Sequence, residues 1–222
     1  MLLYDAVLFD LDGVLTDTAA LHAACWKRTF DAVLDEPFDV RDDYLAHVDG
    51  KPREDGVRDM LRARGMAADD ATVRAIADRK QALVERMLAR EGVTPFPGAV
   101  AWVRSLRRAG IRTAVVSSSA NCGGVLRAAG IAELFDRVVD GGDVVRLGLR
   151  GKPAPDGFLE AARQLSVAPR RAVVVEDAVA GVAAGRAGEF GLVIGVQRGA
   201  GRAALQAAGA HLVVDDLQEL AP

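Results

Sequence analysis

An apolar run that ends in two carboxylates is the feature that most restricts how this chain can fold. Ala6–Phe9 form the run, Asp10 follows directly, and Asp12 comes two positions later. An unbroken apolar segment predicts a strand buried on both faces, as at the centre of a parallel sheet. Ligands of open α/β sheets bind beyond the carboxyl ends of such strands, so we expect both acids at a functional site. On its own, Asp-x-Asp is equally consistent with a solvated turn or a helix cap.

The spacing of the two acids restricts their geometry. Residues two apart lie on the same side of an extended strand, so both carboxylates would face the same way. Gly13 then lets the backbone turn sharply. Such a pair can share a metal ion, or it can divide the roles of nucleophile and general acid/base.

Further apolar runs predict the fold class. They are Ala6–Phe9, 111–116, 173–175, Leu192–Val196 and Leu212–Val214. Helix-like segments separate most of them, which predicts an α/β fold with a doubly wound, Rossmann-like parallel sheet. Strand-like runs are missing between Asp17 and Thr94, where amphipathic helical patterns replace them. We therefore expect a small all-helical cap domain, residues 17–94, inserted after the first strand of a core formed by residues 1–16 and 95–222.

The predicted cap begins directly after the turn that carries Asp10 and Asp12. Both of its connections to the core must therefore run over the end of the sheet where ligands bind. We expect these connections, near residues 16–17 and 94–98, to act as hinges and the cap to act as a lid.

Composition restricts the class of partner. With 28 basic and 31 acidic residues the net charge is −3, so no basic surplus favours nucleic acid. No segment approaches the roughly 20 apolar residues of a membrane span, and no signal-like segment opens the chain, so we expect a cytoplasmic protein. Cys25 and Cys122 lack metal-ligand spacing and are expected to be reduced thiols. A site contained in one chain needs only a monomer and a small-molecule partner.

Polar residues also follow three of the later segments. They are Ser117, Ser118, Ser119 and Asn121 after the second run, Lys152 in the segment GKPAPD, and Glu176 with Asp177 after the third run. Taken singly, each set is typical of a helix cap or a solvated loop charge. Capping does not predict that these three sets occur together with the Asp10 and Asp12 pair.

Four carboxylates gathered at one edge of a sheet require a cation or raised pKa values. Hard oxygen ligands favour Mg²⁺. With Lys152 as a further counter-charge and Ser117 as a donor, the site suits a phosphoryl group, and Asp10 would serve as the nucleophile.

Four residues of the insert stand out, and two of them, Lys80 and Arg53, suggest an anionic ligand. His22 and Trp26 share one face of a helix that Asp17 is expected to cap, a placement that is more often typical of core packing. Lys80 falls on the apolar stripe of a helix over residues 71–90, where it could reach out to solvent or meet an anion. Arg53 opens another helix, where the macrodipole disfavours a cation unless an anion is bound.

The four polar motifs, in this order, resemble those of the haloacid dehalogenase superfamily. The resemblance implies that Asp10 forms an aspartyl-phosphate and that Asp12 is the general acid/base, with its backbone carbonyl directed at Mg²⁺. Glu176 and Asp177 would complete the metal site together with Asp10. Ser117 and Lys152 would hold the transferring phosphoryl group.

Most of the chain further resembles the β-phosphoglucomutase-like family. The similar stretches are LFDLDGVLTDTAALHAACW, DGKPREDGV, DRKQALVERM, VVSSSAN, GKPAPD and VVVEDAVAGV. This likeness implies that Thr18 and His22 control Asp12, that Trp26 packs at the cap hinge, and that Arg53 binds the phosphate distal to the reacting one. Lys80 would contact the sugar or its phosphate. The remaining residues expected to bind substrate are Gly50, Lys51, Ser118, Ser119 and Asn121.

The implied activity is a Mg²⁺-dependent interconversion of β-glucose 1-phosphate and glucose 6-phosphate through β-glucose 1,6-bisphosphate. A phosphatase acting on a small sugar phosphate is the alternative, and a catalytically silent sugar-phosphate binding protein is a third hypothesis. Asp49 and Ala120 stand where the family pattern has lysine, which predicts weaker binding or a shifted substrate unless Lys51 compensates. The loop at 141–149 is also longer than is usual in the family.

Overall fold

A six-stranded parallel sheet forms the centre of the protein in the computed structural model, which describes residues 4–220. Its order is β3-β2-β1-β4-β5-β6. The strands are β1 (Ala6–Phe9), β2 (Arg112–Val116), β3 (Arg137–Val139), β4 (Ala172–Glu176), β5 (Leu192–Val196) and β6 (Leu212–Val214). All five predicted strands are confirmed. The prediction missed β3, which has three residues, one of them an exposed arginine, and so no clear apolar run.

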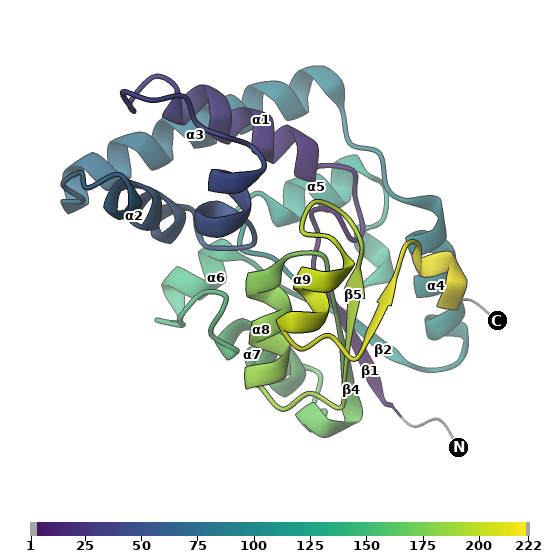
Figure 1. The fold of residues 1–222 in the computed structure, drawn as a ribbon. Helices are drawn as coiled ribbons and strands as arrows, with labels where there is room; N and C mark the ends of the chain where they lie inside the picture. Colours follow the sequence, from purple (N-terminus) through teal and green to yellow (C-terminus); the bar gives the residue numbers. More distant parts are fainter. Residues whose placement is uncertain (1–3, 221–222) are drawn as a thin grey trace.

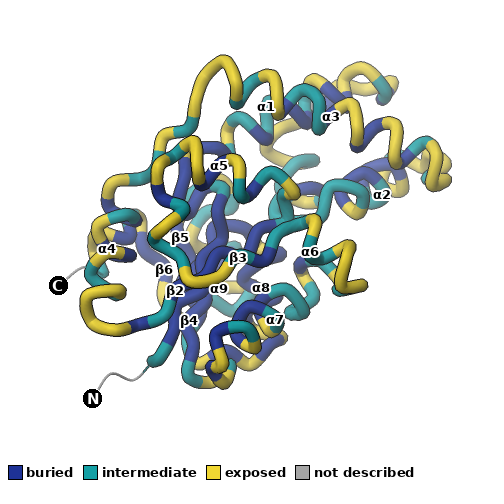
Figure 2. Tube along the Cα trace, turned by 180° about the vertical axis from the view of Figure 1, so that it is seen from behind, coloured by how far each residue is buried: buried dark blue, intermediate teal, exposed yellow. Residues whose placement is uncertain are grey.

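Side chains alternate between the two faces of the sheet and build a core on each. Figure 1 shows the helices arranged around the sheet. Phe9 and its neighbours pack against α4 (Pro97–Arg108) and α5 (Cys122–Ala128). Leu8 and its neighbours pack against α7 (Asp156–Gln164), α8 (Val179–Ala187) and α9 (Arg202–Ala207). Figure 2 shows the strands as the most buried part of the trace. This is the predicted doubly wound architecture.

The helical insertion between β1 and β2 contains α1 (Ala19–Phe30), the π-helical turn η1 (Tyr44–Val48), α2 (Arg53–Ala63) and α3 (Asp70–Glu91). Figure 1 shows these helices gathered at one end of the sheet. They have their own apolar core, in which Trp26 stacks on Phe30 and Phe30 on Phe38 at centroid distances of 5.1 and 5.0 Å. Such aromatic pairs contribute about 0.5–1.5 kcal/mol each beyond the area they bury.

The two connections of the insertion lie side by side. The amide of Asp17 donates to the carbonyl of Thr94 (3.0 Å), and the amide of Phe96 donates to the carbonyl of Leu15 (2.9 Å). Their action as hinges, like the domain boundaries at 16–17 and 94–95, remains a prediction.

Two local predictions were wrong. Asp17 does not cap α1, since the helix begins at Ala19 and Thr18 occupies the N-cap position without a side-chain capping bond. Residues 141–149 are not all loop, because a capping box of Asp140 and Asp143 starts α6 (Gly141–Arg146). Among residues 4–220, no helix is long and apolar enough to span a membrane.

Candidate active site

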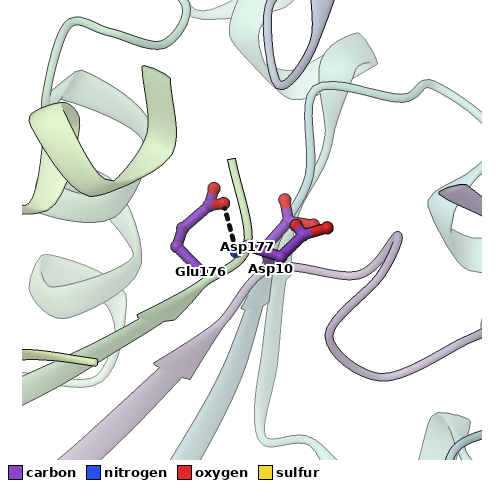
Figure 3. Close-up of side chains that lie close together, drawn as sticks. All are labelled: Asp10, Glu176 and Asp177. Atoms are coloured by element: carbon purple, nitrogen blue, oxygen red, sulfur yellow. Dashed lines mark hydrogen bonds between the residues drawn. The ribbon is translucent and has the colours of Figure 1, made fainter. Parts of the chain in front are cut away.

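Three carboxylates meet where β1 and β4 end (Figure 3). Phe9 pairs with Val175, so Asp10 and Glu176 leave the sheet at the same level, and Asp177 follows. One oxygen from each of the three carboxylates lies within 4.8 Å of the others. Burial, reinforced by the negative charges of the neighbouring acids, raises the pKa of both Asp10 and Asp177 well above the usual range. A hard divalent cation would offset this repulsion, and an all-oxygen donor set fits one.

Gly13 makes room for this cluster. It adopts φ +87°, a left-handed conformation that glycine accepts without strain. A Cβ atom at this position would lie 2.0 Å from Oδ2 of Asp177. The turn at Gly13 therefore packs directly against the carboxylate of Asp177.

Lys152 is the buried counter-charge of the cluster. Its Nζ lies 2.5 Å from Oδ1 of Asp10 and 2.7 Å from Oε1 of Glu176, and it also donates to the carbonyl of Val116 (3.0 Å). Burial acts to lower the pKa of Lys152, but attraction to the two carboxylates outweighs it and raises that pKa. The solvated-loop interpretation of Lys152 is therefore wrong, since the side chain is 6% exposed.

Glu176 contributes to the site through both of its oxygens. Oε1 accepts from Lys152, while Oε2 accepts from the backbone amides of Asp177 and Ala178, each at 3.0 Å. These bonds fix Lys152 beside Asp10. The helix-cap interpretation of Asp177 is wrong, because Ala178 is the N-cap of α8 and no side chain caps the helix.

The carboxylate of Asp12 turns away from the acidic cluster and toward the cap. Oδ1 accepts from the hydroxyl of Thr18 and lies 3.2 Å from Nε2 of His22. Although burial acts to raise the pKa of Asp12, its interactions with His22, the hydrogen bond from Thr18 and the charge of Lys80 lower it to about 2. Asp12 is therefore ionised at neutral pH.

Behind His22 lies Lys80, whose Nζ is 2.7 Å from Nδ1 of His22. An ammonium group can only donate, so Nδ1 must accept, and in the neutral ring the proton is then on Nε2, where it faces Asp12. Lys80 also lies 5.0 Å from the ring centroid of Trp26, within cation–π range. Burial, together with the nearby Arg53, lowers the pKa of Lys80 to about 8 against the opposing attraction of Asp12. At 6% exposure Lys80 does not reach solvent.

The hydroxyl and amide cluster after β2 forms a chain of local hydrogen bonds. Oγ of Ser117 accepts from the amide of Ser119 (3.1 Å), and Oγ of Ser119 accepts from the amide of Asn121 (3.2 Å). Ser118 instead donates to the carbonyl of Gly50 in the insertion, at 2.8 Å. The cluster thus joins the core to the insertion at the site.

A cavity of about 960 Å³ lies between the insertion and the core. The predicted site residues that line it are Asp10, Asp12, His22, Trp26, Gly50, Lys51, Arg53, Lys80, Ser117, Ser118, Ser119 and Asp177. The others, Thr18, Asn121, Lys152 and Glu176, are outside the lining and contact lining residues through the hydrogen bonds described above or, for Asn121, through Gln81. The structure therefore brings the whole predicted set together.

The charge changes noted in the sequence occur at this cavity. Asp49 and Ala120 both line it. Burial raises the pKa of Asp49 to about 6, assisted by the charges of Glu176 and Asp12 and opposed by a hydrogen bond from Tyr44. Lys51 does not compensate for Asp49, because its Nζ lies 2.5 Å from Oδ2 of Asp59.

Among the lining residues that sequence reasoning missed, two contact residues that it had singled out. Tyr44, in η1, hydrogen bonds to Asp49, and Gln81, in α3, contacts Arg53 and Asn121. Neither stood out in the sequence, except that Gln81 directly follows Lys80.

Comparisons with known proteins agree with this geometry. Residues 4–188 match the family described as haloacid dehalogenase-like hydrolase. The chain is 45% identical to a β-phosphoglucomutase from Mycobacterium tuberculosis, over 97% of this chain and 90% of the relative. It is 34% identical to hexitol phosphatase A from Escherichia coli, over 81% of this chain and 77% of the relative. The crystal structure of CbbY from Rhodobacter sphaeroides in complex with xylulose-(1,5)bisphosphate is similar, with a TM-score of 0.81, 28% identity, and coverage of 98% of this chain and 96% of that chain.

Proposed function

The chain belongs to the haloacid dehalogenase-like hydrolases, in the β-phosphoglucomutase-like family, and on this premise we propose that it is a Mg²⁺-dependent β-phosphoglucomutase. It would interconvert β-D-glucose 1-phosphate and glucose 6-phosphate through an aspartyl-phosphate and β-glucose 1,6-bisphosphate. Family membership makes the chain an enzyme of the hydrolase and phosphotransferase class, which argues against a silent binding protein.

One observation carries the proposal: cations of the insertion line the same cavity as the carboxylates of the core. Arg53 and Lys80 come from α2 and α3, whereas Asp10 and Asp12 follow β1. A mutase must hold a bisphosphate at both ends and accept it in either orientation. A second cationic site is therefore required for the mutase reaction, whereas hydrolysis of one phosphate ester needs no such site.

The residues of the core suit phosphoryl transfer. An oxygen of Asp10 attacks phosphorus and displaces the sugar oxygen, which takes a proton from protonated Asp12 and leaves as a hydroxyl, so that the aspartyl-phosphate forms. In the second half of the cycle the sugar hydroxyl attacks that phosphorus, Asp12 accepts its proton, and the Asp10 oxygen leaves. With a pKa of about 2, Asp12 is in the form that accepts a proton. Asp10, Glu176 and Asp177 are the residues that would hold Mg²⁺, which stabilises negative charge on the transferring group.

Hydrolysis of a small sugar phosphate is the second candidate, and Asp49 is the observation that favours it. A carboxylate lines the cavity where the family pattern has lysine, and Lys51 is paired with Asp59 instead of replacing the missing charge. If the bisphosphate were held more weakly, it would dissociate sooner, and water could then hydrolyse the aspartyl-phosphate.

Time-resolved phosphorus NMR separates the two candidates. The purified protein is supplied with Mg²⁺, β-glucose 1-phosphate and a trace of β-glucose 1,6-bisphosphate. We expect glucose 6-phosphate to form faster than inorganic phosphate, and inorganic phosphate alone would instead establish a phosphatase. Arg53→Ala should abolish isomerisation, while Arg62→Ala, which removes an exposed cation from the same helix, should not. An equal loss in both variants would contradict the role of Arg53.

A further inference from the structure

Gln81 connects the insertion to the core through its side-chain amide. Its Oε1 accepts from Nη1 of Arg53, at the start of α2. Its Nε2 donates to Oδ1 of Asn121, the residue before α5 in the core, at 2.8 Å. The same nitrogen donates to Oε1 of Glu85 on its own helix, at 2.7 Å. One side chain thus joins three elements and uses all of its amide hydrogens.

Arg53 fixes the direction of every bond in this network. A guanidinium group can only donate, so the atom of Gln81 that faces it must be the carbonyl oxygen. The amide nitrogen of Gln81 must then face Asn121, and the side-chain oxygen of Asn121 must accept the hydrogen bond. This leaves the Nδ2 group of Asn121 directed away from Gln81 as a donor.

Two of the N–H groups next to Gln81 lack an acceptor. Among the side chains of residues 4–220, the buried polar atoms without a hydrogen-bond partner are Nε of Arg53 and Nδ2 of Asn121. A buried donor without an acceptor is unfavourable, so native proteins pair nearly all such groups. Both orphaned atoms are donors and one belongs to a cation. They therefore fit an anion with several acceptor oxygens and do not fit a cation.

We propose that Gln81 is a positioning residue that presents Arg53 and Asn121 as donors to the second phosphate of a bisphosphate substrate. The identity of that anion rests on the proposed function. Gln81 itself need not touch the substrate, because it acts by fixing the orientation of the two groups that do. Without it, Asn121 could turn its oxygen toward the phosphate.

This arrangement also makes the proposed second-phosphate site, formed by Arg53 and Asn121, dependent on contact between the insertion and the core. Arg53 and Gln81 belong to the insertion, and Asn121 belongs to the core. The hydrogen bond from Ser118 to the carbonyl of Gly50 crosses the same boundary. Binding of the second phosphate and docking of the insertion must then favour each other by the same factor.

Calorimetry tests the proposal without turnover. The two probes are β-glucose 1,6-bisphosphate, measured in an Asp10→Asn background, and Mg²⁺ alone, measured with Asp10 retained, because the acidic cluster does not include Gln81. We expect Gln81→Met, of similar length but without the amide, to weaken bisphosphate binding about tenfold, with less than threefold effect on Mg²⁺ binding. Asn121→Asp, which replaces the free donor by an oxygen, should weaken bisphosphate binding at least as much. Glu85→Gln is the matched control, since it keeps an acceptor for Gln81, and both affinities should stay within about twofold.

An equal effect of Gln81→Met on both probes, or no effect on either, would overturn the proposal, and so would unchanged bisphosphate binding in Asn121→Asp. Thermal unfolding of each variant establishes that it is folded, and Asn121→Asp keeps the test open should Gln81→Met not fold. The proposed function is tested separately by the NMR assay on the unmodified protein, because the calorimetric ratio requires binding but no phosphoryl transfer.

Discussion

Nζ of Lys80 lies 2.7 Å from Nδ1 of His22, although 58 residues separate them in the chain. Through this contact a cation in α3 keeps the proton of the neutral His22 ring on Nε2, the nitrogen that faces Asp12. The pKa of Lys80 is lowered to about 8, chiefly by burial, so the contact loses its charge in mildly alkaline solution.

Activity should therefore depend on pH through Lys80. We expect kcat/KM for β-glucose 1-phosphate to fall as the pH rises through about 8, because neutral Lys80 no longer enforces donation from His22 to Asp12. Lys80→Met should lower kcat/KM about 10²-fold, the scale of general acid–base catalysis. Lys80→Arg should move the alkaline limb of the profile upward. Lys27→Met, on the more exposed part of α1, should leave the profile unchanged, and an unmoved limb in Lys80→Arg would contradict the assignment.

Removing Lys152 should destabilise the protein far more than removing a surface lysine. Lys152→Met leaves Asp10 and Glu176 buried without their counter-charge, and breaking such a pair costs about 3–5 kcal/mol. Lys27 pairs with Asp31 on the surface, so Lys27→Met should cost no more than about 1 kcal/mol. Urea unfolding in a metal-free buffer measures both changes. Similar losses in the two variants would argue against a buried ion pair.

Mg²⁺ should stabilise the folded protein, because the acidic cluster proposed to bind it is assembled in the native state alone. At 100 times its Kd the ion should add about 2.7 kcal/mol to the free energy of unfolding, seen as a higher Tm that a chelator reverses. Asp177→Asn should abolish most of this increase, whereas the exposed Asp78→Asn should preserve it. A Mg²⁺ response that persists in Asp177→Asn would place the ion elsewhere.

Asp49 should lower stability at neutral pH. Burial raises its pKa from 3.8 to about 6, so the folded state holds this proton more tightly than the unfolded state does. The stabilising contribution of the protonated form is complete below pH 4 and is lost as the pH rises through about 6. Asp49→Asn should therefore raise the free energy of unfolding by about 3 kcal/mol at pH 8 and by about half of that at pH 5. Urea unfolding of both proteins at the two pH values gives the difference, and a gain that does not depend on pH would exclude this cause.

Gly50→Ala should disturb the contact between the insertion and the core. Gly50 has φ +72°, and a Cβ there would lie 2.7 Å from Cβ of Ala178. Gly65→Ala is the matched control, because Gly65 has φ +65° but no atom within 4 Å of the added carbon. Both variants pay the strain of a left-handed alanine, about 1 kcal/mol. Only Gly50→Ala should also lower kcat/KM, by about tenfold or more, and reduce the compaction that we expect a bound phosphosugar to produce in solution scattering.

Much of the architecture follows from local patterns in the sequence. Apolar runs predicted five of the six strands, and the loss of strand-like runs after Asp17 predicted the helical insertion. Because the carboxyl ends of parallel strands lie at one edge of a sheet, the polar residues after three strands could be grouped in advance. Asp10, Ser117 and Glu176 do lie together. Their chemical roles remain predictions.

The class of fold and the set of residues at the site can thus be recognised from the sequence alone. The pairing of those residues is set by tertiary packing. It directs Asp12 toward His22, ties Lys51 to Asp59, and places Gln81 between Arg53 and Asn121. Strand and helix patterns arise from the periodic exposure of neighbouring residues, so they can be recognised locally. Hydrogen-bond partners and pKa values depend on burial and on charges brought near by packing, which no local pattern records.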